Sequence, residues 1–218
     1  MSDLVFKQKK SMAILFLEGD SPIRKVYEEA AAQLKGDLLF AYSGVVESYQ
    51  KEIAHLSGVN RKNLPKLRVF NPLSNGVLKY RYEGDVNEME VEDVVEFIQD
   101  YKRGVLKPFY RSLKPPAVND GPIKIVVGKT YPEFVLNKQE DVLVLYTAEW
   151  CKECKKVEHT LLELAKHCEN VKDLVIAKYD VYNNENEGLA VDDFPTVRFH
   201  AANTREVVAL DTTKADNY

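Results

Sequence analysis

The sequence has few cysteines, no long apolar run and no strong excess of charge, and each of these absences excludes a class of protein. Three cysteines among 218 residues are too few for a scaffold held together by disulfides. No apolar run approaches the roughly 18 residues that a membrane-spanning helix needs. The net charge of −4 argues against electrostatic binding of nucleic acid. We therefore expect neither a membrane nor a nucleic acid as a partner.

The ends of the sequence carry no targeting signal. The start, MSDLVFKQKK, lacks the apolar core and the small-residue cleavage site of a signal peptide. The sequence also contains no N-glycosylation motif and no endoplasmic reticulum retention tail. Two interpretations fit this pattern, a cytosolic protein and a piece cut from a longer chain.

Two copies of one pattern organise the chain. The segments LPKLRVF (64–70) and FPTVRFH (194–200) place a proline before an apolar strand, at positions 130 residues apart. The segments DSPIRKVYEEAAAQLK (20–35) and CKECKKVEHTLLELAK (151–166) align at an offset of 131 residues. Chance similarity between amphipathic segments is the alternative. Two matches at nearly one offset favour a duplicated fold unit.

Each copy is predicted to be an α/β unit of the thioredoxin type, a mixed sheet with helices on both faces. Continuous apolar runs such as MAILFL (12–17) indicate buried strands, and the period of 3.6 residues after Pro22 indicates a helix. In the second copy we expect a long helix starting at the cysteines and a short helix before Pro195. The buried face of the long helix is predicted to include Val157, Leu161, Leu164, Ala165 and Cys168.

The proline-rich segment 108–120 lacks periodicity and is predicted to link a first domain, 1–107, to a second, 121–218. After its proline-led strand the first domain continues for about 38 residues, whereas the second has 18. We therefore expect the second domain to lack its C-terminal helix. Its sheet would then keep an uncovered apolar face and lower stability unless the natural chain continues.

Cys151 and Cys154 form a C-x-x-C pair at the predicted start of a helix. Unpaired backbone N–H groups and the helix dipole favour negative charge there, so the Cys151 thiol should ionise below the free value of about 8.5. A Cys151 thiolate can attack a substrate disulfide, and Cys154 can then release the substrate. Of the two residues between the cysteines, Lys152 should favour the Cys151 thiolate and Glu153 should disfavour it.

Other interpretations of the cysteines remain open. A zinc site needs two more ligands, and His159, His167 and Cys168 are poorly spaced for a tetrahedron with the pair. A purely structural disulfide between Cys151 and Cys154 closes too short a loop to stabilise much. Cys168 is interpreted as an apolar filler.

Pro195 is predicted to be a cis-proline beside the cysteines, where its backbone offers strand-like hydrogen bonds to a substrate chain. An ordinary trans proline at a strand start is the alternative. The first copy has Asp20 and Ile23 where the second has cysteines, so it cannot exchange thiols. Its apolar strands are interpreted as core, with an exposed binding pocket as the second interpretation.

These residues resemble the protein disulfide isomerase family over essentially the whole chain. The motifs that carry the resemblance are VLVLYTAEWCKECKK (142–156), IAKYD (176–180) and DFPTVRFH (193–200), which match a catalytic a′ domain. The first copy resembles the non-catalytic b′ domain, whose apolar pocket binds partly folded polypeptide, and 104–116 resembles the linker between them.

The resemblance implies roles for individual residues. It makes Cys151 the nucleophile, Cys154 the resolving cysteine, Pro195 the cis-proline and Lys178 the family's buried lysine. As substrate-binding residues it implies Trp150 and Phe194 near the cysteines and Leu15, Leu17, Phe40 and Tyr42 in the first domain. No cofactor or metal is implied. The implied partners are unfolded or partly folded proteins, with glutathione or a sulfhydryl oxidase for redox exchange, in the endoplasmic reticulum lumen.

Several positions depart from the family pattern. Lys152-Glu153 replaces Gly-His, Glu149 stands where proline is common, and Leu145 replaces the buried glutamate that pairs with the lysine. Without that carboxylate Cys154 should deprotonate less readily. The family's mobile arginine has only Lys214 near its expected place.

We therefore expect a thiol–disulfide oxidoreductase and isomerase with a polypeptide-binding domain. A chaperone-like binding module with weak redox activity is the alternative, and a cytosolic thioredoxin-like reductase is a third.

Overall fold

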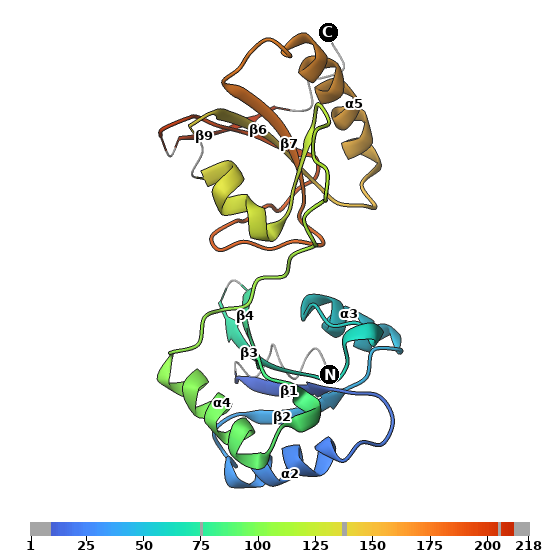
Figure 1. The fold of residues 1–218 in the computed structure, drawn as a ribbon, viewed down its shortest axis with the longest axis vertical. Helices are drawn as coiled ribbons and strands as arrows, with labels where there is room; N and C mark the ends of the chain where they lie inside the picture. The colour runs from blue at the N-terminus through green and yellow to red at the C-terminus, as the bar shows by residue number, and fades with distance from the viewer. Residues whose placement is uncertain (1–9, 75, 137–138, 205, 212–218) are drawn as a thin grey trace. The chain divides into compact units, whose positions relative to one another are not determined.

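The computed structural model describes residues 10–74, 76–136, 139–204 and 206–211 (Figure 1). The chain divides into two compact units, Met1–Phe109 and Tyr110–Tyr218, and each has one mixed sheet. The α/β architecture expected from the sequence is therefore confirmed. In the described part of the chain, no helix is both long enough and apolar enough to cross a membrane.

The first unit is built on four strands in the order β2-β1-β3-β4. Their bounds are β1 Met12–Phe16, β2 Leu39–Ser43, β3 Lys66–Leu73 and β4 Gly76–Arg81. Strand β2 runs parallel to β1, and the other two pairings are antiparallel. Helices are α2 (Ile23–Gln33), α3 (Ser48–Leu56) and α4 (Val91–Arg103).

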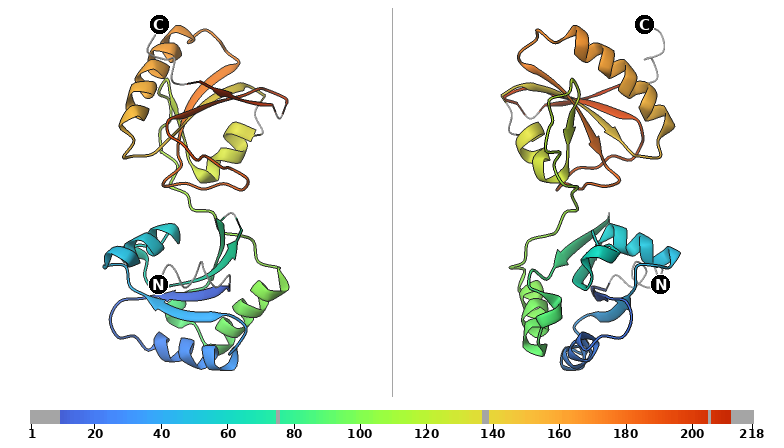
Figure 2. Two further views of the ribbon diagram at one scale, coloured as in Figure 1. Left: turned by 180° about the vertical axis from the view of Figure 1, so that it is seen from behind. Right: turned by 45° about the vertical axis from the view of Figure 1, so that its right-hand side comes forward.

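The central strand β1 is buried along its whole length because helices cover both faces of this sheet (Figure 2). Ala13 and Leu15 pack with α2 and α4, whereas the alternate residues Met12, Ile14 and Phe16 pack on the side of α3. A continuous apolar run is what such a two-sided position requires.

The second unit has five strands in the order β5-β7-β6-β8-β9. Their bounds are β5 Lys124–Val126, β6 Asp141–Thr147, β7 Leu174–Asp180, β8 Thr196–His200 and β9 Val207–Leu210. Helix α5 (Lys152–His167) packs on one face through Leu161 and Ala165. The opposite face carries the short π-helix η4 (Pro132–Leu136), which buries Val135.

Among the described residues, the second unit has fewer helices than the first. In the described residues, which end at Asp211, no helix follows β9, as expected. The short helix predicted before Pro195 is wrong, because residues 181–195 form only turns and bends. This segment contains three Asn and two Asp and has no helical apolar stripe, and residues of these types favour turns.

The buried stripe of α5 is narrower than predicted. Leu161 and Ala165 are buried, but Leu164 is 40% exposed and Cys168, at the C-cap, is only half-buried. The stripe runs through Cys154, Leu161 and Ala165, and Leu164 lies to the side of it.

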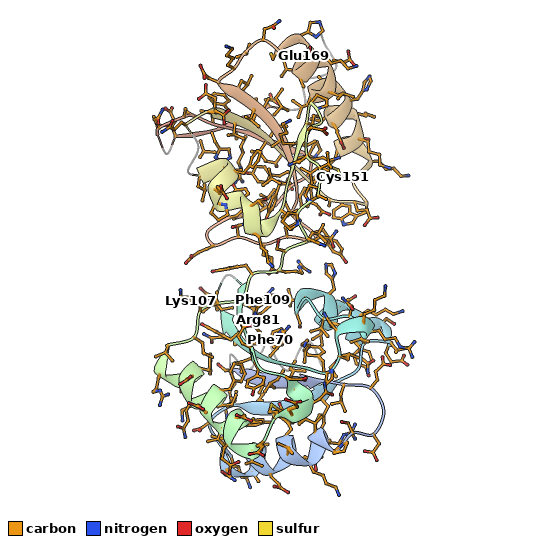
Figure 3. The ribbon with its side chains drawn as sticks, in the orientation of Figure 1. Phe70, Arg81, Lys107, Phe109, Cys151 and Glu169 are labelled. Atoms are coloured by element: carbon orange, nitrogen blue, oxygen red, sulfur yellow. A yellow bond between two sulfur atoms is a disulfide. The ribbon has the colours of Figure 1, made fainter. Side chains whose placement is uncertain are left out.

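Residues at the start of the predicted linker, 108–120, are bound to the two units. Phe109 donates its N–H to the Lys79 carbonyl (2.6 Å), and its ring lies near the guanidinium groups of Arg68 and Arg81, at 5.3 and 5.1 Å (Figure 3). In the second unit, Arg111 exchanges backbone and side-chain contacts with Glu185. Tyr110 is thus the single residue between an anchor on the first unit and an anchor on the second.

Candidate functional site

The two cysteines lie where β6 passes into α5. The Cys151 N–H donates to the Ala148 carbonyl (2.9 Å), which turns the chain after the strand. Cys151 is the N-cap of α5, and its Sγ accepts a hydrogen bond from the Cys154 N–H at 3.1 Å. The predicted helix start at the cysteines is therefore present, with one of its free backbone donors already aimed at sulfur.

Cys151 and Cys154 are joined by a disulfide with an S–S distance of 2.08 Å. Cys151 is 7% exposed and Cys154 is 1% exposed, so the outer sulfur is the more accessible one. Cys168 is a free cysteine at the far end of the same helix. The described residues contain no group of three or more His, Cys, Asp or Glu side chains that could hold a metal ion.

Aromatic side chains frame the disulfide. Trp150 is 64% exposed and meets Phe194 edge to face, with ring centroids 5.6 Å apart. Phe194 packs against Ala148, Cys151 and Cys154. The Phe194–Pro195 peptide bond is cis, as expected from the sequence, and β8 begins at the next residue. The structure thus brings together Trp150, the two cysteines, Phe194 and the start of β8.

A cavity of about 300 Å³ lies beside Cys151 in the same unit. Its apolar part is formed by Leu113, Ile125 and Val127, and Cys151 lies on its wall. Its charged lining groups come from three places, Glu149 before the helix, Lys155 and Glu158 on α5, and Lys178 and Asp180 on β7. Ionisable side chains therefore line the same cavity as Cys151.

Lys178 pairs with a carboxylate of helix α5 and not with a residue of the neighbouring strand β6. In the register of β6 and β7, Lys178 lies opposite Leu145, which is fully buried and apolar. The Lys178 ammonium group instead pairs with the Glu158 carboxylate of α5. Sequence reasoning identified that Leu145 cannot supply a carboxylate to Lys178, but not that Glu158 supplies one. The spacing of four between Cys154 and Glu158 was the available signal.

The residues between the cysteines are exposed to solvent. Lys152 and Glu153 both lie on the outer side of the first turn of α5. Glu153 pairs with Lys156 at 2.8 Å, with both side chains about two-thirds exposed. Such a pair contributes little energy, so the helix start remains the main influence on Cys151.

Asn184, which sequence reasoning missed, lines the cavity and organises the loop to which it belongs. Its Oδ1 accepts hydrogen bonds from the N–H groups of Leu113 and Gly128, each at 2.9 Å, and its Nδ2 donates to the Asp180 carbonyl. The side chain is 1% exposed. One buried amide therefore joins three separate segments of the second unit.

The predicted binding residues of the first unit lie together on the α2 and α4 side of the sheet. Leu15 and Leu17 are buried in the core, and Phe40 and Tyr42 pack half-buried against it. The Tyr42 hydroxyl donates to Glu28 at 2.8 Å, and burial, then this carboxylate, raises the pKa of Tyr42 to about 12. Phe40 and Tyr42 are thus the members of the set that reach the surface.

Comparisons with known proteins agree with this geometry. The Thioredoxin family model matches residues 122–217, and a second model, Thioredoxin-like domain, matches residues 2–100. Protein disulfide isomerase-like 1-4 of Arabidopsis thaliana is 34% identical over 208 residues, which cover 94% of this chain and 34% of that protein. Protein disulfide-isomerase of Oryctolagus cuniculus is 31% identical over 177 residues, covering 81% of this chain and 34% of that protein.

A further relative matches about half of the chain. Protein disulfide-isomerase A4 of Mus musculus is 38% identical over 121 residues, which are 55% of this chain and 19% of that protein. The chain spans about a third of the length of the longer-matching curated relatives. Both units therefore have the thioredoxin-like fold, and the redox pair lies in the unit that the Thioredoxin model matches. The chain belongs to the protein disulfide isomerase family of the thioredoxin superfamily.

Proposed function

We propose that this chain catalyses thiol–disulfide exchange in substrate proteins, as an oxidoreductase and isomerase, through Cys151 and Cys154. The observation that carries the proposal is the disulfide at the first turn of α5, with Cys151 as the N-cap and the less buried of the two cysteines. In the reduced protein, free backbone donors and the helix dipole stabilise a thiolate at this position.

The exchange proceeds in two steps. The Cys151 thiolate attacks a substrate disulfide, forms a mixed disulfide, and the second substrate sulfur leaves with its electron pair as a thiolate. Cys154 then loses its proton and attacks Cys151, which restores the enzyme disulfide and releases the other substrate sulfur. The substrate gains two electrons and the enzyme loses two. The reverse sequence oxidises a dithiol, and glutathione or a sulfhydryl oxidase can reset the enzyme.

Pro195 and the two aromatic residues form the proposed substrate-binding surface. Phe194 packs on the cysteines and Trp150 lies exposed beside it, so an incoming chain can contact aromatic surface next to the reactive sulfur. The backbone at Pro195, just before β8, is the proposed partner for strand-like hydrogen bonds with that chain.

The first unit is proposed to be a non-catalytic binding domain for partly folded polypeptide. It contains no cysteine, because all three lie in the second unit. The proposed contact surface is formed by Phe40 and Tyr42, with Leu15 and Leu17 behind them. We propose domain limits of 1–107 and 121–218, with Arg111 and Leu113 of the joining segment 108–120 bound to the second domain. By analogy with the family we propose residence in the endoplasmic reticulum lumen.

The test is reduction of insulin and reactivation of scrambled ribonuclease by the wild-type chain and by Cys151→Ala. We expect activity to fall to the uncatalysed rate in Cys151→Ala. Unchanged activity in this variant would contradict the proposal and favour a binding module. Suppression of aggregation by the same variant measures binding separately, and Phe40→Ser should reduce that suppression while insulin reduction persists.

A further inference from the structure

The buried position of Cys154 raises the question of which group accepts its proton. Cys154 is 1% exposed, yet the second step of the proposed exchange requires its thiol to lose a proton before it can attack Cys151. A buried thiol cannot pass its proton directly to bulk water. Leu145, opposite Lys178 in the sheet, is apolar and cannot accept it.

Glu158 is the acidic residue that follows Cys154 on the same face of α5. The two residues are separated by four positions in a continuous helix, so their side chains project from successive turns on one side. Glu158 also lines the cavity on whose wall Cys151 lies. Glu158 therefore follows Cys154 on one side of α5 and shares the cavity lining with Cys151.

Lys178 holds this carboxylate in place from the sheet. The ion pair joins α5 to β7, two elements that also enclose the cavity. The side chains of Lys178 and Glu158 are 33% and 35% exposed. A proton that reaches Glu158 can therefore pass on to solvent.

We propose that Glu158 accepts the Cys154 proton during the resolving step, with Lys178 as the residue that positions it. This inference rests on the proposed exchange reaction. The Cys154 S–H bond breaks, its proton moves to a Glu158 oxygen directly or through one water molecule, and the sulfur attacks Cys151. The Cys151–substrate bond breaks and the substrate sulfur leaves with the electron pair. Glu158 then releases the proton to solvent.

The other charged groups of the cavity shape the pH dependence of this step. Lys155 on the helix and Lys178 on β7 are positive, and Glu149 before the helix and Asp180 on β7 are negative. If Glu158 acted only through its charge, its removal would change the rate of the Cys154 attack in the opposite direction to the loss of a proton acceptor. Removing a nearby negative charge favours the Cys154 thiolate and would accelerate the attack.

The experiment is a stopped-flow reaction of the reduced chain, carrying Cys168→Ala, with 5,5′-dithiobis(2-nitrobenzoate). The first equivalent of coloured thiolate reports attack by Cys151 and depends on reagent concentration. The second equivalent reports attack by Cys154 and does not depend on reagent concentration. We expect Glu158→Gln to slow the second phase about tenfold or more near pH 7 and to leave the first unchanged. The deficit should shrink as hydroxide becomes available above pH 9.

Matched variants separate this role from a structural one. Glu163→Gln breaks another ion pair of α5, with Lys166, on its exposed face and should leave both phases unchanged. Lys178→Met should slow the second phase, and Glu158→Asp should retain part of its rate even if Glu158→Gln folds poorly. A second phase that is unchanged or faster in Glu158→Gln would overturn the proposal. Loss of the second phase in the wild type would instead overturn the exchange reaction itself.

Discussion

The Tyr146 hydroxyl and His200 Nε2 share a hydrogen bond of 2.9 Å on the face of the second sheet opposite to α5. The same hydroxyl contacts the Tyr131 hydroxyl at 2.6 Å, and the Arg198 guanidinium lies 5.1 Å from the Tyr146 ring centroid. Burial, and secondarily Arg198, lowers the pKa of His200 below its ordinary value of 6.5. Burial therefore disfavours the protonated form of His200 in the folded chain.

This buried histidine makes the second unit sensitive to acid. The unfolded chain binds a proton at His200 near pH 6.5 while the folded chain resists it, so the free energy of unfolding should decrease as pH falls below about 6.5. The decrease ends below the folded-state pKa. Urea unfolding of the oxidised chain between pH 5 and 7.5, followed by the fluorescence of Trp150, measures it, since Trp150 is the one tryptophan. His200→Gln should flatten the dependence, and His159→Gln, at an exposed helix position, should not.

The reactivity of Cys151 should depend on pH as expected for a thiolate at a helix start. In the reduced chain we expect its alkylation by iodoacetamide to titrate with an apparent pKa between about 3.5 and 7.5. Site-resolved mass spectrometry separates Cys151 from Cys154 and Cys168, and free cysteine in the same buffer provides the reference. A midpoint near 8.5 would show that the backbone donors of the first turn do not activate this thiol.

Loss of the Asn184 amide should destabilise the second unit. Asn184→Ala leaves the N–H groups of Leu113 and Gly128 and the Asp180 carbonyl without their partner, at a cost of about 2–3 kcal/mol in the free energy of unfolding. Asn170→Ala, at an exposed turn, is the matched control. Equal stabilities of the two variants would contradict the structural role of Asn184. Denaturant titration with Trp150 fluorescence makes the measurement.

Phe109 should stabilise the edge of the first sheet. Arg68 is 4% exposed, and burial, then Arg81, lowers its pKa to about 10, so contact with the Phe109 ring partly compensates its desolvation. Phe109→Ala should cost about 1–2 kcal/mol and increase hydrogen exchange in residues 66–81, as measured by mass spectrometry. Val105→Ala, at a residue that is 62% exposed, should leave exchange unchanged. Equal exchange in the two variants would mean that Phe109 contributes no stability.

The parts of the fold that depend on local pattern were predictable. The apolar run of β1, the helix starting at Cys151 and the strand led by Pro195 follow from periodicity and turn chemistry, which act over a few residues. The short helix expected before Pro195 was inferred from the repeat alone, and the Asn-rich composition of the segment overrode it.

The parts that depend on pairing between distant elements were not predictable. Lys178 and Glu158 are on different elements, and only the packing of α5 on the sheet decides that the lysine meets this carboxylate. Likewise nothing near Asn184 in the sequence indicates that its partners are Leu113 and Gly128. The resemblance named four binding residues in the first unit, Leu15, Leu17, Phe40 and Tyr42. It could not tell that Phe40 and Tyr42 reach the surface whereas Leu15 and Leu17 lie beneath it.

The anchors on either side of Tyr110 decide how the second unit can be prepared alone. A recombinant second domain that starts at residue 121 would discard Arg111 and Leu113, which supply partners to Glu185 and Asn184. It would also remove the Leu113 wall of the hollow next to the reactive sulfur. A domain intended for enzymology should therefore begin at Tyr110 or earlier, because a shorter piece would report the kinetics of a site with one side missing.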